Sequence, residues 1–349
     1  DWVDLTQNSN TEVAAGNGTI NTLEVEGVGT TASIAAVTSN DQRLVDAGPL
    51  AAGQAVFTNA LWWVKDRRNT NQHQLVWSDS GTNCLRSPDI AGTVQPYAAP
   101  AGDSVAWCWN AGATRETNDA GSVETQVRAN PAGGFSIVEF TGTGANGSCG
   151  HGLGRTPEFI LITNQSGTSG IARYVWHKDL GSGEYLVLNT NSLVSSNAAM
   201  WGDEVWNNNI FSVGSSNRTN TLNDGKIAFV WASVPGYSAF GTFQGNSNPN
   251  GPVIVTGFKP AWVMFKSTAS GTWSVFDSTR DPHNLTNKKL QPNATTQETT
   301  STTNDCLDFL SNGFKLRCST ASMNSGTIIY AAFAENPTGS SNTSPATAR

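Results

Sequence analysis

The sequence predicts an all-β protein made of tandem β-sandwich modules, and three observations favour this fold class. Ser, Thr, Asn and 35 Gly are abundant, whereas charged residues make up only 13% of the 349 residues. This mixture disfavours long helices, because short polar side chains compete for the hydrogen bonds of the helical backbone. Short alternating apolar segments recur with turn residues roughly every ten positions, as in sandwich domains. The last third of the chain also repeats the middle third, which indicates an array of like modules.

The repeat is visible as a nearly constant shift between paired segments. GRTPEFI at 154–160 is answered by GFKPAWV at 257–263, a shift of 103 residues. NDGKIAF at 223–229 likewise returns as NSGTIIY at 324–330. A fainter third copy begins at ALWWVK, residues 60–65. A repeat of about 100 residues corresponds to one small domain rather than to a solenoid unit.

These copies divide the chain into five expected segments: an irregular N-terminal extension with a diverged first sandwich at 1–112, a polar linker at 113–134, a second module at 135–236, a third at 237–337, and a flexible tail at 338–349. Alternating strands are expected at Gln74–Trp77 and Val105–Trp109 in the first copy. Phe135–Phe140 and its counterpart Tyr237–Phe243 are expected to open the second and third copies. The first copy is shorter, so it has either lost strands or borrowed them from the N-terminal stretch.

Composition and charge narrow the classes of function. The net charge is −7 and the Lys and Arg residues are scattered, so the basic stripe of a nucleic-acid groove is missing from the sequence. No apolar run is long enough to span a membrane, and the first residues do not resemble a signal peptide. The five cysteines lack metal-ligand spacing, so neither a zinc site nor a cofactor is predicted.

Cys306 and Cys318 flank a predicted hairpin and are a candidate disulfide. A two-residue turn at Asn312-Gly313 would place the two cysteines one residue out of register, on opposite faces. A three-residue loop that starts at Ser311 would place them directly opposite each other. The sequence therefore permits this disulfide without requiring it.

Candidates for catalysis are few. His177 is matched by Asp277 in the next copy, which argues against a shared mechanism and favours a solvent-facing residue at a strand end. His151 lies in a glycine-rich loop that no helix follows, so we expect a plain loop. His73 and His283 are expected in polar loops. Asp203 and Glu204 cannot flank one sugar, because adjacent strand residues point to opposite faces.

Two further groups could bind ligands. Asp277, Asp281 and Asp308 are candidate calcium ligands, although no acidic cluster supports them. Among the tryptophans, four fall at alternating strand positions and are expected in the core: Trp62, Trp107, Trp231 and Trp262. Three lie near turns, where an exposed ring could stack on a sugar or contact a partner, although core burial is favoured for each: Trp201, Trp206 and Trp273.

Several longer motifs follow one another in a fixed order: ALWWVKDR at 60–67, SVAWCW at 104–109, GHGLGRTP at 150–157, VPGYSAFG at 234–241, TGFKPAWV at 256–263, DFLSNGFKLR at 308–317 and YAAFAENP at 330–337. Together they resemble a repeat-bearing domain common at the C-terminal end of tail fibres and other virion proteins of tailed bacteriophages from marine and other aquatic sources. The resemblance covers Phe57 to Pro337. It implies a structural or receptor-binding module, built like a concanavalin-like or SPRY-like jelly roll, without catalytic residues. The compressed first copy and the uncharged N-terminal stretch depart from the pattern.

The leading hypothesis is therefore a non-enzymatic virion structural protein, either a tail-fibre or a capsid-decorating subunit. We expect it to be exposed on the virion surface or outside cells, and to assemble with other virion proteins and with itself, most often as a trimer. The alternatives are a carbohydrate-binding, lectin-like module that contacts host glycans, and a subunit of a cellular extracellular filament. A glycan-degrading enzyme would need two carboxylates about 5–9 Å apart in a groove.

Overall fold

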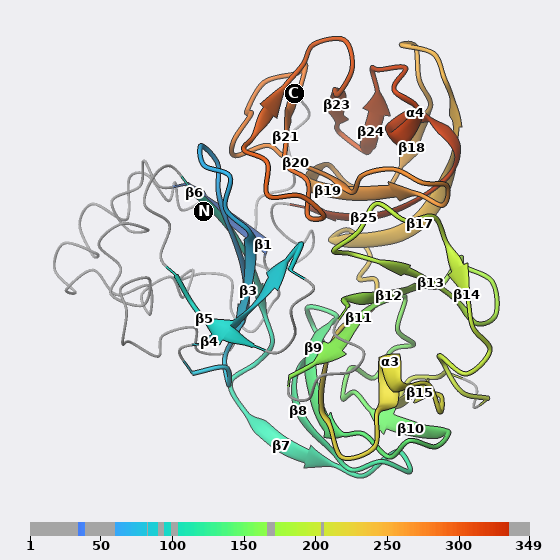
Figure 1. Ribbon diagram of the computed structural model, residues 1–349. Coiled ribbons are helices and arrows are strands. Elements are labelled where there is room, and N and C mark those ends of the chain that lie inside the picture. Colours follow the sequence, from blue (N-terminus) through green and yellow to red (C-terminus); the bar gives the residue numbers. More distant parts are fainter. Residues whose placement is uncertain are drawn as a thin grey trace, which may run out of the picture.

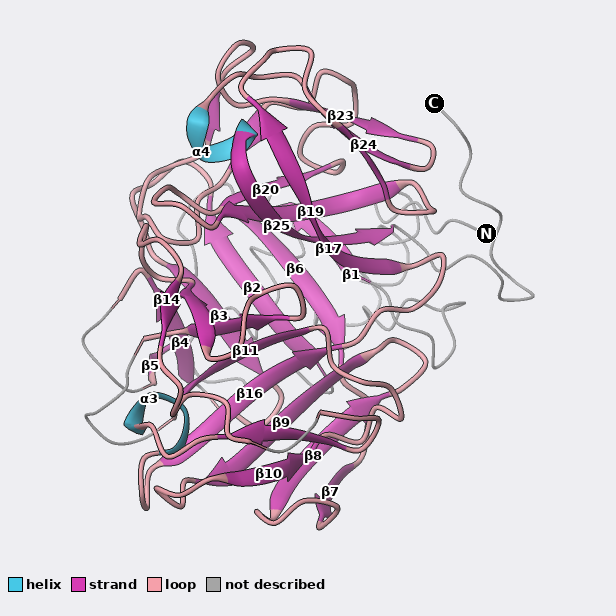
Figure 2. Ribbon diagram, turned by 90° about the vertical axis from the view of Figure 1, so that its right-hand side faces the viewer, coloured by secondary structure: helices cyan, strands magenta, loops and turns pink. Residues whose placement is uncertain are grey.

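The computed structural model describes residues 60–81, 83–89, 94–98, 104–165, 172–203 and 206–334, together with the backbone of Ile34–Thr38 (Figure 1). The chain is 48% strand and 3% helix, which confirms the all-β, sandwich-type fold. Two four-residue helices lie within the described residues, α3 (Asn217–Asn220) and α4 (Ala321–Asn324), far apart at the periphery (Figure 2). In the described part of the chain, no helix is long and apolar enough to cross a bilayer.

The strands fall into three groups that follow the chain, here called the first, second and third modules. The first module is a six-stranded sheet in the order β1-β6-β2-β3-β4-β5. Its strands are β1 (Ile34–Thr38), β2 (Ala60–Asp66), β3 (His73–Trp77), β4 (Asn83–Ser87), β5 (Gln95–Pro96) and β6 (Ser104–Asn110).

The second module has an eight-stranded sheet, ordered β14-β13-β12-β11-β16-β9-β8-β7, and a two-stranded sheet of β10 and β15. Its strands are β7 (Arg115–Asn118), β8 (Thr125–Asn130), β9 (Phe135–Thr141), β10 (Gly147–Gly150), β11 (Phe159–Asn164), β12 (Tyr174–His177), β13 (Glu184–Val187), β14 (Ser195–Ser196), β15 (Ile210–Val213) and β16 (Gly225–Trp231).

The third module has a four-stranded sheet, β17-β25-β19-β20, a three-stranded sheet, β18-β24-β23, and the pair β21-β22. Its strands are β17 (Ser238–Asn246), β18 (Val253–Val255), β19 (Pro260–Ser267), β20 (Ser274–Asp277), β21 (Lys288–Lys289), β22 (Thr299–Thr300), β23 (Leu307–Leu310), β24 (Gly313–Leu316) and β25 (Ser325–Ala334).

All three modules contain the same four-stranded core, in which the last strand lies between the first two. The equivalent sets are β1-β6-β2-β3, β9-β16-β11-β12 and β17-β25-β19-β20. The register agrees as well, since Leu61↔Trp109, Phe159↔Trp231 and Trp262↔Phe333 are equivalent pairs. Strand β1 takes the place of β9 and β17, so the first copy borrows a strand from the N-terminal stretch.

The segment 113–134, expected as a linker, instead contains β7 and β8, which extend the second sheet beyond β9. The expectation was wrong because this hairpin is polar: Val127 is its main apolar contribution, and the strand β7 is largely exposed. Edge strands can be polar because only one face and one edge are covered.

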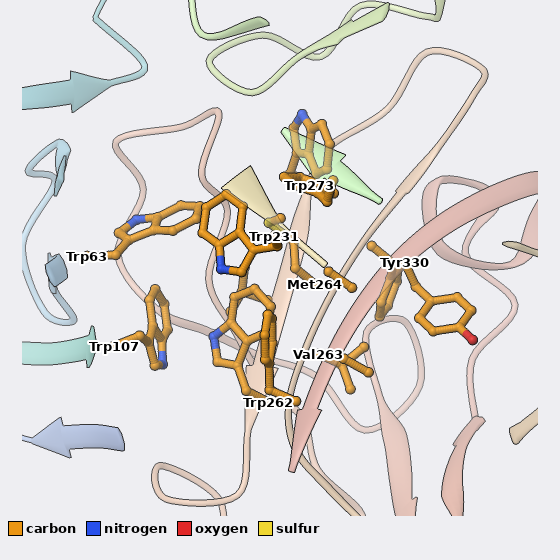
Figure 3. Packing of buried hydrophobic residues seen from close by; sticks show 14 of the residues in the cluster. Trp63, Trp107, Trp231, Trp262, Val263, Met264, Trp273 and Tyr330 are labelled. Carbon is orange, nitrogen blue, oxygen red and sulfur yellow. The ribbon is translucent and has the colours of Figure 1, made fainter. Parts of the chain in front are cut away.

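The three modules pack on one another through a shared aromatic centre (Figure 3). The Trp109 ring lies 5.8 Å from Trp231, 5.5 Å from Trp262 and 5.7 Å from Phe333, measured between centroids, and all three contacts are T-shaped. An apolar gap of about 10 Å³ remains there, far less than a ligand needs. The four tryptophans expected in the core are buried, as predicted: Trp62, Trp107, Trp231 and Trp262.

Polar contacts join each module to the other two. Trp107 Nε1 of the first module donates to Asp277 Oδ2 of the third at 3.1 Å. Arg128 of the second module pairs with Asp79 of the first at 2.8 Å. Trp273 Nε1 of the third module donates to the Val187 carbonyl of the second at 2.9 Å. The modules therefore form one closed cluster, in which each module contacts both others, rather than a linear array.

Candidate functional site

Two of the three tryptophans proposed as ligand contacts are buried. Trp201 is 5% exposed and its Nε1 donates to the Glu184 carbonyl at 2.8 Å. Trp273 is 1% exposed at the interface between the second and third modules. Neither ring can offer a face to a sugar. Core burial, which the sequence favoured for each ring despite the nearby turns, is confirmed for these two tryptophans.

Trp206 is partly exposed, and its ring packs against a second tryptophan, Trp176. Its ring lies on that of Trp176 from β12, with centroids 3.9 Å apart and planes inclined at 30°. Asn207 and Asn208, which follow Trp206 in the chain, are exposed; Asn207 Oδ1 accepts the backbone N–H of Asn209, and Asn208 Oδ1 accepts from the Thr156 hydroxyl. Sequence reasoning missed Trp176 because YVWH at 174–177 looks like an ordinary core strand. Alternation places Trp176 on the face opposite Val175, where it is partly buried and packs against the apolar cluster that contains Tyr174.

A polar cleft of about 670 Å³ lies between the first and second modules. Strands β7, β8 and β9 form one wall, and the end of β3 with the turn that follows forms the other. Its volume is within the range of ligand pockets. The lining is mostly amide, hydroxyl and charged groups: Trp77, Asp79, Ser80, Asn83, Val94, Arg115, Glu124, Gln126, Glu139, Phe140, Thr141, Gln165 and Gly225.

Arg115 is the one cation among the described residues that line this cleft, and it pairs with two of the three carboxylates there. Arg115 pairs with Glu139 at 2.7 Å and lies 3.8 Å from Asp79. Glu139 also accepts hydrogen bonds from Trp77 Nε1 and from the amide of Gln165. Its carboxylate is therefore fixed as an acceptor, which suits binding of hydroxyl groups better than proton transfer.

His151 and His177 are buried, which corrects the expectation that His177 faces solvent. In each ring Nδ1 accepts a backbone N–H two residues further on, at 3.2 Å. The Nε2 atoms lie 3.2 Å from the Asn207 carbonyl and 3.3 Å from the Tyr330 carbonyl, respectively. These contacts fit a neutral ring with its proton on Nε2. Asp277, which occupies the position equivalent to His177, is also buried, because both lie where modules meet.

Acid is expected to destabilise the fold through these two histidines. Burial lowers the pKa of both to about 4, and for His177 the attraction of Asp179 only partly opposes it. The unfolded chain, with a histidine pKa near 6.5, therefore binds more protons than the folded chain between about pH 4 and pH 6.5, so stability is lost as the pH falls through that window. Lowering the pH from 7 to 5 should cost about 2 kcal/mol per ring.

Urea unfolding at several pH values measures this loss. A His151→Gln variant should show a smaller loss between pH 7 and pH 5, whereas His283→Gln, at an exposed position, should behave like the parent chain. If the unfolding free energy fell equally with pH in the parent chain and in His151→Gln, buried His151 would not be a source of the acid sensitivity.

The remaining histidines differ from each other. His73 lies on β3 rather than in a loop, is fully buried, and accepts a hydrogen bond from Trp63 Nε1 at 3.0 Å. Burial lowers its pKa well below the usual value. His283 is exposed, in a polar loop as expected.

The acidic candidates do not form a metal site. Asp277 pairs with Arg280, Asp281 accepts the backbone N–H of Asn287, and Asp308 lies 3.5 Å from Arg317. Within the described residues, no group of three or more His, Cys, Asp or Glu could hold a metal ion. Asp203 is bonded to Asn146 at 2.6 Å, and Glu204 lies outside the described residues.

The hairpin between the two candidate cysteines has a different turn from either alternative considered. Leu307 pairs with Leu316 and Leu310 with Gly313, so the turn is Ser311-Asn312. This register places Cys306 opposite Arg317, whose carbonyl lies 3.3 Å from Cys306 Sγ. Both cysteines are buried free thiols, and burial raises the pKa of Cys306 to about 11. The pairing register differs from both predicted registers because Gly313 begins the second strand instead of occupying the turn.

Comparison with known proteins identifies the family. Residues 89–337 match the model of a domain of unknown function, DUF7483. The match covers well over half of the chain, so the protein belongs to this family. It spans the second and third modules and the end of the first. No curated protein and no solved structure matches the chain.

Proposed function

We propose that the protein is a non-enzymatic structural subunit of a tailed-phage virion, either a tail-fibre or a capsid-decorating protein. The observation that carries the proposal is the packing of three modules of one topology into a closed cluster. Repetition of one four-stranded core, with polar contacts and aromatic rings at each junction, provides a rigid body with extensive loop surface. That is what a surface-displayed assembly part needs, and it agrees with the resemblance to virion proteins noted in the sequence.

Assembly with other copies is part of this proposal. The central sheet faces of the three modules already cover one another, so further copies must associate through outer surfaces. Closed symmetric oligomers are the usual outcome, and we propose a homotrimer. Native mass spectrometry of the purified chain should show three times the chain mass. A strict monomer at micromolar concentration would contradict self-assembly, and absence of the chain from purified particles of a phage that encodes it would contradict a virion role.

A second function, contact with host glycans, is favoured by the pair Trp176 and Trp206. Two partly exposed, stacked indoles provide a face for the apolar side of a sugar ring, and the exposed residues Asn207 and Asn208 that follow Trp206 carry amide donors for its hydroxyl groups. The polar cleft between the first and second modules is an alternative position for such a sugar.

Glycan-array binding followed by titration distinguishes the two positions. Trp206→Ala should weaken binding by about two- to tenfold, since one aromatic contact contributes about 0.5–1.5 kcal/mol. Gln126→Ala, which removes an amide from the cleft, is the matched control and should bind like the parent chain. Loss of binding in the Gln126 variant alone would place the sugar in the cleft and overturn the role of the tryptophan pair.

A further inference from the structure

A buried lysine faces a buried asparagine across the two central strands of the second module. Lys226 on β16 pairs in register with Asn164 on β11, and the two are 0% and 1% exposed. Residues directly opposite each other in an antiparallel pair place their side chains on the same face, with Cβ atoms about 5 Å apart. The ammonium of Lys226 contacts the Oδ1 atom of Asn164. An amine and a carboxamide are therefore held together out of water.

A carboxylate completes the group. The Nδ2 atom of Asn164 donates to Asp224 Oδ2 at 3.2 Å. The remaining contacts of Lys226 Nζ are Thr221 Oγ1 at 2.9 Å and the Asn217 carbonyl at 3.2 Å. Burial lowers the pKa of Lys226 to about 8, although the attraction of Asp224 opposes the shift. A substantial fraction of the amine is thus neutral, and nucleophilic, at mildly alkaline pH.

We propose that Lys226 and Asn164 become joined by an intramolecular isopeptide bond, with Asp224 as the group that moves the proton. The lone pair of Lys226 Nζ attacks Cγ of Asn164 and forms the new C–N bond. The Cγ–Nδ2 bond then breaks. Asp224 accepts a proton from the attacking amine and passes it to Nδ2, which leaves as ammonia. The step needs no oxidant and no other reactant.

The equivalent positions in the other modules show what is particular to this one. Lys65 and Lys266 are also fully buried, but they lie at the position equivalent to Thr163 rather than to Lys226, and their ammonium groups donate to the backbone carbonyls of Asp66 and Ser267. The positions equivalent to Asn164 are those same two residues, Asp66 and Ser267, and they pair across the sheet with Ser104 and Ile328. Only the second module, among the described strands, sets a lysine opposite a carboxamide.

The bond would tie together β11 and β16, which are neighbours at the centre of the eight-stranded sheet. It would also close the chain between residues 164 and 226 into a covalent loop that contains β12–β15 and α3. Such a cross-link limits the freedom of the unfolded chain as a disulfide does. The inference concerns the covalent state of the chain and does not depend on the proposed function.

Mass spectrometry of the denatured, purified chain tests the proposal. The intact mass should lie about 17 Da below the mass calculated from the sequence, owing to loss of ammonia. Tryptic digestion should yield the peptide 156–173 joined to the peptide that contains Lys226, with no cleavage after Lys226. An intact mass equal to the sequence mass, with the two peptides released separately, would overturn the proposal without the need for any variant.

Variants then assign the roles. Asn164→Ala should restore the full mass of its own sequence, and Asp224→Ala should leave most of the chain uncross-linked. Lys266→Arg, at an equally buried lysine, should retain the ammonia loss. Cross-linking of Asp224→Ala at the rate of the parent chain would exclude Asp224 as the proton carrier.

Discussion

Replacing Arg280 with alanine is expected to lower the free energy of unfolding by about 3–5 kcal/mol, the cost typical of leaving a buried charge without its partner. Arg280 is fully buried between modules. Its Nε donates to Asp277 Oδ2 at 2.5 Å, and its NH1 group lies 2.8 Å from Glu298. Without the guanidinium, the buried carboxylate of Asp277 keeps only hydrogen bonds to compensate its desolvation.

The same substitution disturbs the junction between the first and third modules. Glu298 also pairs with Arg67 of the first module at 2.9 Å. Burial alone would raise the pKa of Glu298, but hydrogen bonds from Arg67 and the charge of Arg280 outweigh this effect and lower it. Loss of Arg280 removes one of the two arginines that stabilise the ionised carboxylate of Glu298.

Urea unfolding followed by tryptophan fluorescence measures the effect. Arg317→Ala is the matched control, because Arg317 is 45% exposed and only 3.5 Å from Asp308. An exposed pair of this kind contributes about 0–1 kcal/mol. Similar losses for Arg280→Ala and Arg317→Ala would contradict the buried network.

Replacing Trp109 with alanine is expected to cost about 3–5 kcal/mol and to weaken the coupling between modules. The Trp109 ring contacts one ring of the second module and two of the third, so its removal leaves a cavity where all three modules meet. Limited proteolysis should then cut between modules under conditions in which the parent chain is resistant.

Trp62 provides the control for Trp109. It lies on β2, is 5% exposed, and belongs to a separate apolar cluster within the first module. Trp62→Ala should destabilise that module by a comparable amount without exposing sites between the second and third. Equal proteolytic patterns for the two variants would contradict a coupling role for Trp109.

The sequence alone predicted much of this architecture. The repeat between GRTPEFI and GFKPAWV matched β11 with β19, and the equivalent pairs Phe159↔Trp231 and Trp262↔Phe333 follow from it. Alternating apolar positions also identified the core tryptophans, because alternation reports which face of a strand is covered.

What sequence reasoning missed arises from contacts between modules and from turn geometry. His177 and Asp277 are polar, and both are buried where they contact another module, His177 at the Tyr330 carbonyl and Asp277 at Trp107 Nε1. Strand periodicity describes one sheet and cannot show a neighbouring module. The register of the hairpin at Ser311-Asn312 depended on a difference of one residue in the turn, which the Asn-Gly pair did not determine.

Calorimetric unfolding of the purified chain tests most directly whether the three modules form one interlocked body. A single transition is predicted, with the calorimetric enthalpy equal to the van't Hoff enthalpy, because the aromatic centre and the ion pairs couple the modules. Two or three separate transitions, each with the enthalpy of one module, would show that the modules unfold independently and do not form one interlocked body.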